Sequence, residues 1–140
     1  MADDASQLPL RQQLQDLRAA LVDLHKTLVD SERVSYEQTI GAIQSPNRFL
    51  QLLTDDPWFA WLHRLSLLIV TMDQALDSKR QPLTEANAVD LIQTVRELLV
   101  ASTEGEGFAR HYDEALQRDP DVVLAHARVV RLFDSRRSRN

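Results

Sequence analysis

The 140-residue sequence contains no cysteine. Disulfides, thiolate zinc sites, cysteine-ligated iron–sulfur clusters and a cysteine nucleophile are therefore excluded, which leaves histidine and carboxylate as the strong metal ligands. Glycine is also scarce: the three glycines form neither a Gly-x-Ser-x-Gly motif nor a glycine-rich phosphate loop. These absences speak against a serine hydrolase of that type and against nucleotide binding through a standard loop.

We expect neither a secretory signal nor a membrane span. Residues 1–7 are acidic and polar, without the basic and apolar regions of a signal peptide. The most apolar run, residues 59–72, is shorter than the roughly 18 residues that cross a bilayer, and it contains His63 and Arg64. Together with the absence of cysteine, these features predict a cytoplasmic protein without a membrane span.

Positive charge is scarce overall and concentrated near one end. The formal net charge of −5 argues against attraction of the whole chain to nucleic acid. Residues 118–140 nevertheless hold six arginines and three aspartates. Cations at a helix C-terminus complement the helix dipole, and we favour this role over phosphate binding. We therefore expect no nucleic-acid partner.

The composition is that of an ordinary globular protein. Hydrophobic residues make up 44% of the chain and charged residues 26%, and the length suits one compact domain. We expect a single domain over residues 1–140, with residues 1–8 and 135–140 frayed.

Leucines recur at alternating steps of four and three in the first part of the chain. This spacing stacks one apolar seam along a helix and is the clearest periodicity in the sequence. From Leu10 onward the chain has no proline or glycine before Gly41, so we expect this helix to continue to Ile43. The seam consists of Leu10, Leu14, Leu17, Leu21, Leu24 and Leu28.

At three positions a polar residue directly precedes a proline. Each such pair predicts the start of a helix, because the polar side chain can cap free backbone amides and proline fits the first turn. Ser45-Pro46 predicts a short helix over residues 46–53. Asp56-Pro57 predicts a helix over residues 57–78 that is apolar nearly all round and is therefore expected at the centre of the fold. Asp119-Pro120 predicts the last helix.

Two further helices are expected between these. Thr84 is a candidate N-cap for a helix that ends near Ser102, and another short amphipathic helix begins near Phe108. No segment has the alternation or the turn residues of a β-hairpin. The predicted class is all-α, as an up-and-down bundle of four main helices plus short helices.

A polar stretch within the first helix is one candidate binding site. Glu32, Arg33, Tyr36 and Glu37 have spacings that allow pairing along a helix. If Arg33 or Tyr36 faces the bundle, a polar pocket follows. The alternative is a solvated helix surface with weak ion pairs.

The two tryptophans form a second candidate site. Trp58 and Trp61 lie within one turn, and tryptophan is enriched at interface hot spots, so a partner surface is one interpretation. Core packing is the commoner use of such residues.

The four histidines do not have the spacing of known helical metal or phosphotransfer sites. A di-iron bundle needs Glu-x-x-His on two helices, whereas this chain offers only the reverse order, from His111 to Glu114. The His-x-x-Lys-Gly pattern of histidine phosphotransfer domains is absent as well. We therefore predict no metal, no cofactor and no catalytic residue.

Two resemblances extend this interpretation. Residues 112–125 resemble the junction between two tetratricopeptide repeats, but no second copy lies about 34 residues upstream, so the similarity is to a local helix-turn-helix unit. More of the chain resembles a set of small bacterial all-helical proteins without an assigned function. That resemblance implies a free-standing bacterial cytosolic domain, and it implies no activity. It rests on Leu24-His25-Lys26, Glu32-Arg33, Tyr36-Glu37, Ser45-Pro46, Asp56-Pro57-Trp58-Phe59-Ala60-Trp61-Leu62 and Leu65-Ser66.

The sequence favours a non-enzymatic protein-interaction module, with a homodimer as one form. The reason is surplus apolar surface beyond one helix face, which commonly marks an interaction site. The alternative is a bundle that binds a small molecule or metal in a polar pocket between helices. That pocket would lie near Glu32, Arg33, Tyr36, Glu37 and His63.

Overall fold

The structure is a computed structural model that describes residues 2–77, 83–100 and 107–133. These ranges contain helices and no strand, which confirms the all-α class. The finer expectation, an up-and-down bundle of four main helices, stays a prediction. The elements are α1 (Ala2–Thr39), α2 (Pro46–Asp55), the 3-10 helix η1 (Pro57–Leu62), α3 (His63–Asp77), α4 (Glu85–Leu98), α5 (Phe108–Arg118) and α6 (Pro120–Phe133).

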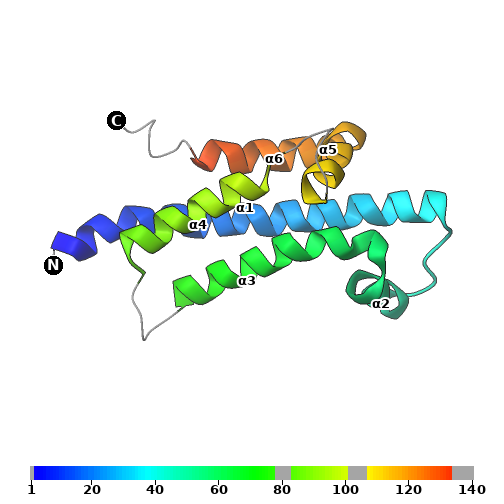
Figure 1. Cartoon of the computed structure of the whole chain (residues 1–140), viewed down its shortest axis with the longest axis horizontal. Helices are drawn as coiled ribbons and strands as arrows, with labels where there is room; N and C mark the ends of the chain where they lie inside the picture. The colour runs from blue at the N-terminus through cyan, green and yellow to red at the C-terminus, as the bar shows by residue number, and fades with distance from the viewer. Residues whose placement is uncertain (1, 78–82, 101–106, 134–140) are drawn as a thin grey trace.

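The long helix α1 is the centre of the fold. It runs the length of the molecule, with α3 and α6 along different sides of it (Figure 1), and it also packs against α4, α5 and η1. Both α3 and α6 run antiparallel to it. Arg11 of α1 donates to the carbonyl oxygen of Leu76 at 2.9 Å, and Gln13 donates to that of Leu132 at 3.0 Å.

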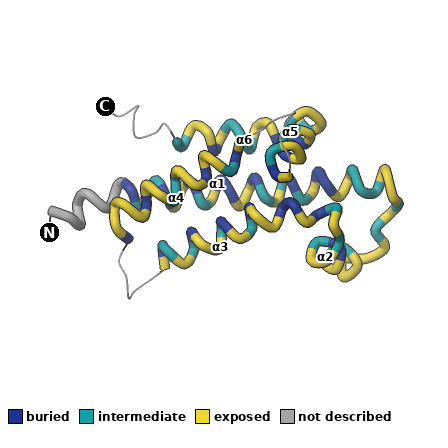
Figure 2. The backbone as a smooth tube through the Cα atoms, in the orientation of Figure 1, coloured by how far each residue is buried: buried dark blue, intermediate teal, exposed yellow. Residues whose placement is uncertain are grey.

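The expectation that residues 57–78 form the central helix is wrong. They form two elements, η1 and then α3, and α3 leaves Leu67 and Val70 exposed. The central place belongs to α1 because its leucine seam gives the longest continuous apolar stripe. All six seam leucines are buried, and Figure 2 shows buried residues recurring along α1.

The 3-10 winding of η1 follows from its start and its core contacts. The carboxylate of Asp56 accepts the backbone N–H of Trp58 at 2.8 Å, and Asp56 also accepts the N–H of Phe59 at its carbonyl oxygen. Because a 3-10 helix has three residues per turn, Phe59 and Leu62 lie on one face, and both are buried.

The other capped starts are confirmed. Ser45 Oγ accepts the backbone N–H three residues further on at 3.0 Å, and Thr84 Oγ1 does the same at 3.1 Å. The Asp119 carboxylate accepts the N–H two residues further on at 2.9 Å. These caps begin α2, α4 and α6, and α5 and α6 pack together as the helix-turn-helix unit that the repeat-like residues indicate.

The bounds of α1 are Ala2 and Thr39, so the helix includes residues 2–8. The expected fraying of residues 1–8 stays a prediction. The helix ends at Thr39 and does not reach Ile43, because the chain turns at Gly41, where φ is 150°.

The end of α4 is also earlier than expected. It ends at Leu98, not near Ser102, because Leu99 leaves the helical conformation with ψ of 33° while its side chain stays buried. Ser102 itself and residues 135–140 lie outside the described residues. Among the helices that are described, none is long and apolar enough to cross a membrane.

Candidate functional site

Glu32 joins α1 to α5 through an ion pair whose carboxylate is buried and whose Arg118 side chain is 33% exposed. Its carboxylate lies 3.0 Å from Nη2 of Arg118, and the Glu32 side chain is only 8% exposed. The Ser31 hydroxyl accepts two further hydrogen bonds from the same guanidinium, at 3.0 and 3.3 Å. Arg118 is 86 residues away in the chain, so this network links distant segments.

The other polar residues of α1 lie around an aromatic cluster. The ring of Tyr36 meets that of Trp58 edge-to-face, with centroids 5.6 Å apart. The Arg33 guanidinium lies 5.1 Å from the centre of the Phe49 ring, and Arg33 Nε is 3.4 Å from the Glu37 carboxylate. Arg33 is exposed, so this ion pair resembles the solvated surface pairs that contribute little to stability.

The two tryptophans have different surroundings. Trp61 is 8% exposed and stacks on His111 with ring centroids 5.5 Å apart, and its ring also packs against Phe108 at 5.2 Å. Trp58 is half-buried. The Trp61 side chain therefore belongs to the core between η1 and α5.

His63 is placed against α2. Its Nε2 lies 2.8 Å from the carbonyl oxygen of Leu53, to which it donates. The structure thus places the Tyr36 ring against Trp58 and pairs Arg33 with Glu37. It places the Glu32 side chain against α5 and the His63 ring against α2. The polar pocket shared by these residues stays a prediction.

Two histidines form short hydrogen bonds between helices. His25 Nε2 on α1 lies 2.6 Å from Ser66 Oγ on α3, and His126 Nδ1 on α6 lies 2.6 Å from the Tyr112 hydroxyl on α5. Burial lowers the pKa of His25, and the nearby His63 lowers it further. Burial also lowers the pKa of His126 and raises that of Tyr112. We assign both imidazoles as neutral acceptors of hydroxyl protons.

These shifts predict that the protein is less stable in mild acid. A histidine whose folded pKa lies below its unfolded value contributes stability above about pH 6.5, and this contribution is lost as the pH falls through the folded pKa. Urea unfolding between about pH 8 and about pH 5.5 should show this slope. The double variant His25→Gln/His126→Asn retains an acceptor at each position and should flatten it. An equal slope in both proteins would contradict the assignment.

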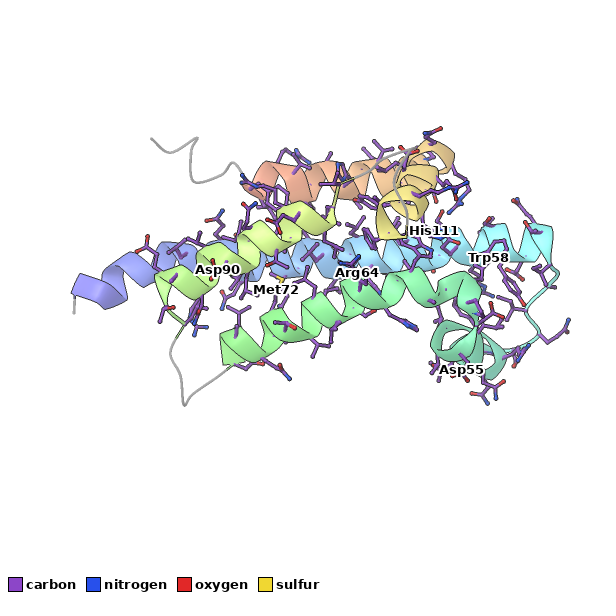
Figure 3. The ribbon with its side chains drawn as sticks, in the orientation of Figure 1. Asp55, Trp58, Arg64, Met72, Asp90 and His111 are labelled. Atoms are coloured by element: carbon purple, nitrogen blue, oxygen red, sulfur yellow. The ribbon has the colours of Figure 1, made fainter. Side chains whose placement is uncertain are left out.

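A groove lies between α3 and α4, with α5 at one end. It encloses about 510 Å³. Figure 3 shows the Arg64 side chain on this side of α3. The lining residues are Arg64, Leu67, Leu68, Thr71, Leu91, Thr94, Glu97, Leu98, Val100, Phe108 and Ala109.

The groove is apolar apart from two charged side chains. Leu67 is 67% exposed and Val100 is 55% exposed. The hydroxyls of Thr71 and Thr94 donate to carbonyl oxygens of their own helices at 2.9 and 2.8 Å, so they offer little to a ligand. The remaining polar groups are the Arg64 guanidinium and the Glu97 carboxylate. An apolar surface with few polar groups is suited to protein contacts or to an apolar ligand.

Sequence reasoning did not place this groove. The sequence feature that indicates the groove is the surplus of apolar residues on α3, but we interpreted that surplus as burial of this helix on all sides. Only the position of α4 shows that the face with Leu67 stays uncovered.

The arginine-rich end is only partly described. Arg118 pairs with Glu32, and Arg128 pairs with Asp23. Arg131 is exposed on α6, and the last three arginines, Arg136, Arg137 and Arg139, lie outside the described residues.

Comparisons of the chain with protein-family models, with curated proteins and with solved structures yield no match. Within the described ranges, no three histidine, aspartate or glutamate side chains are grouped so that they could hold a metal ion.

Proposed function

We propose that the chain is a non-enzymatic protein-interaction module that associates with a second copy of itself through the α3–α4 groove. The observation that carries this proposal is the groove itself, with Leu67 and Val100 both more than half exposed beside it. A second copy suits this surface because it is apolar at its centre and carries one charge of each sign. A face with both signs can complement itself.

The energetics are compatible with dimerisation. Full burial of a leucine or valine side chain contributes about 1.5–3 kcal/mol, and a two-fold interface uses each side chain twice. Leu67 and Val100 from two copies therefore offer four contributions, each reduced to the 67% or 55% of the side chain that is still exposed. This total falls within the range of about 4–15 kcal/mol that association costs, so the partly buried groove residues decide the affinity.

The direct test is Leu67→Glu. We expect the wild-type protein to be a dimer at micromolar concentration and Leu67→Glu to be monomeric, because the change places a charge in the apolar centre of the interface. Sedimentation velocity across a concentration series measures this. The matched control is Leu50→Glu on α2, where the leucine is 63% exposed and does not line the groove. A wild-type monomer at every concentration would refute the proposal.

A second candidate is an apolar small molecule in the same groove. The enclosed volume of about 510 Å³ lies in the usual range for ligand pockets. Native mass spectrometry separates the two candidates: a bare dimer supports self-association, whereas a monomer that carries extra non-covalent mass supports ligand binding.

A further inference from the structure

The two charged residues of the groove lie on opposite walls at the same end. Arg64 is the second residue of α3, and Glu97 is the penultimate residue of α4. Because α3 and α4 run in opposite directions (Figure 1), the start of one helix lies beside the end of the other. Both residues line the groove near Phe108 of α5.

Neither charge is neutralised within the described part of the chain. Arg64 forms no hydrogen bond or ion pair there. Glu97 accepts one hydrogen bond, from Gln93 at 3.1 Å, and forms no ion pair with a described residue. By contrast, Arg128 pairs with Asp23, and Arg18 pairs with Asp73.

We infer that two copies pair about a two-fold axis along the groove, with Arg64 of each copy against the partner's Glu97. An axis in this direction lays α3 of one copy over α4 of the other. In a two-fold interface every such contact occurs twice, so Arg64 of the first copy meets Glu97 of the second and Arg64 of the second meets Glu97 of the first. The dimer therefore contains two equivalent ion pairs, which fix its register. This inference rests on the proposed self-association.

Charge reversal tests the pairing. Arg64→Glu places two negative groups at the position of each ion pair, and Glu97→Arg places two positive groups there. Like charges across an interface are unfavourable, so we expect each variant alone to dimerise at least about tenfold more weakly than wild type. Both side chains lie on the surface, and far-UV circular dichroism and the urea midpoint should match those of wild type.

Mixing the two variants gives the sharpest result. When an Arg64→Glu copy meets a Glu97→Arg copy, the two substituted side chains form one ion pair with its charges reversed. The unchanged Glu97 of the first copy and the unchanged Arg64 of the second form the other ion pair. We expect a heterodimer with an affinity within about threefold of wild type, weakened by high salt. Native mass spectrometry resolves it, because the substitutions change the mass in opposite directions. The double variant Arg64→Glu/Glu97→Arg should again form homodimers.

The control mixture is Arg131→Glu with Asp30→Arg. These residues are exposed on α6 and α1 and do not line the groove. This mixture should give homodimers and heterodimers in statistical proportion.

The outcomes separate this inference from the proposed function. A dimeric wild type that Leu67→Glu disrupts, with no preferential heterodimer in the mixture, would overturn the reciprocal pairing and leave the proposed function intact. A monomeric wild type would overturn both. Preferential heterodimer formation would establish the two-fold pairing.

Discussion

Arg118→Met is expected to lower the free energy of unfolding by about 1–3 kcal/mol, because it leaves the buried Glu32 carboxylate without its cation at a site that is open to solvent on the Arg118 side. The Glu32 side chain is only 8% exposed and that of Arg118 is 33% exposed, so water replaces the lost guanidinium only in part. The Ser31 hydroxyl loses its hydrogen-bond donor in the same change. Urea unfolding followed by circular dichroism measures the loss.

Two further variants show whether the burial of the pair causes this effect. Arg128→Met removes a cation that also joins α1 to a distant helix, but its ion pair with Asp23 is exposed, so we expect a loss below about 1 kcal/mol. The double variant Glu32→Met/Arg118→Met replaces both charges with apolar groups and should recover most of the stability. Equal losses for Arg118→Met and Arg128→Met would show that the buried carboxylate is not the cause.

The second large effect is expected for Trp61→Ala, with a loss of about 3–5 kcal/mol in the free energy of unfolding. Trp61 packs between Phe108 and His111 in the core, so truncation leaves a cavity between η1 and α5. Urea unfolding measures the loss, and near-UV circular dichroism should change because the ring contacts disappear.

Leu67→Ala is the control for a groove side chain. The Leu67 side chain is mostly exposed in the monomer, so this substitution should change the free energy of unfolding of the monomer by no more than about 0.5 kcal/mol. The two residues thus separate stability from association: Trp61→Ala should act on folding, and Leu67→Glu on dimer formation. A stable Trp61→Ala protein that no longer dimerises would instead assign Trp61 to the interface.

Local signals predicted the elements well. The leucine seam specified the buried face of α1, because spacing along a helix determines which side chains share a side. The residues before Pro46, Pro57 and Pro120 gave the starts of α2, η1 and α6, because capping depends only on neighbours in the sequence. Gly41 was visible in the sequence as well, but its position gave no information on how many residues earlier the helix would end.

The arrangement of the elements could not be predicted in the same way. The Glu32–Arg118 contact depends on where α5 docks on α1, and no spacing rule relates residues 86 positions apart. The exposure of Leu67 depends on the angle between α3 and α4. For α3, apolar residues on every side predicted full burial, whereas the fold uses one face for α1 and leaves another open.

The central position of α1 has a consequence for synthesis on the ribosome. This helix is made first, but α6, which packs along it, is made last. At about 5–20 residues per second, the leucine face of α1 waits several seconds for its full set of neighbours. Until then, an apolar stripe several turns long is open to chaperones or to other nascent chains. Slower translation of the second half should therefore lower the yield of folded protein, even though it leaves the stability of the finished chain unchanged.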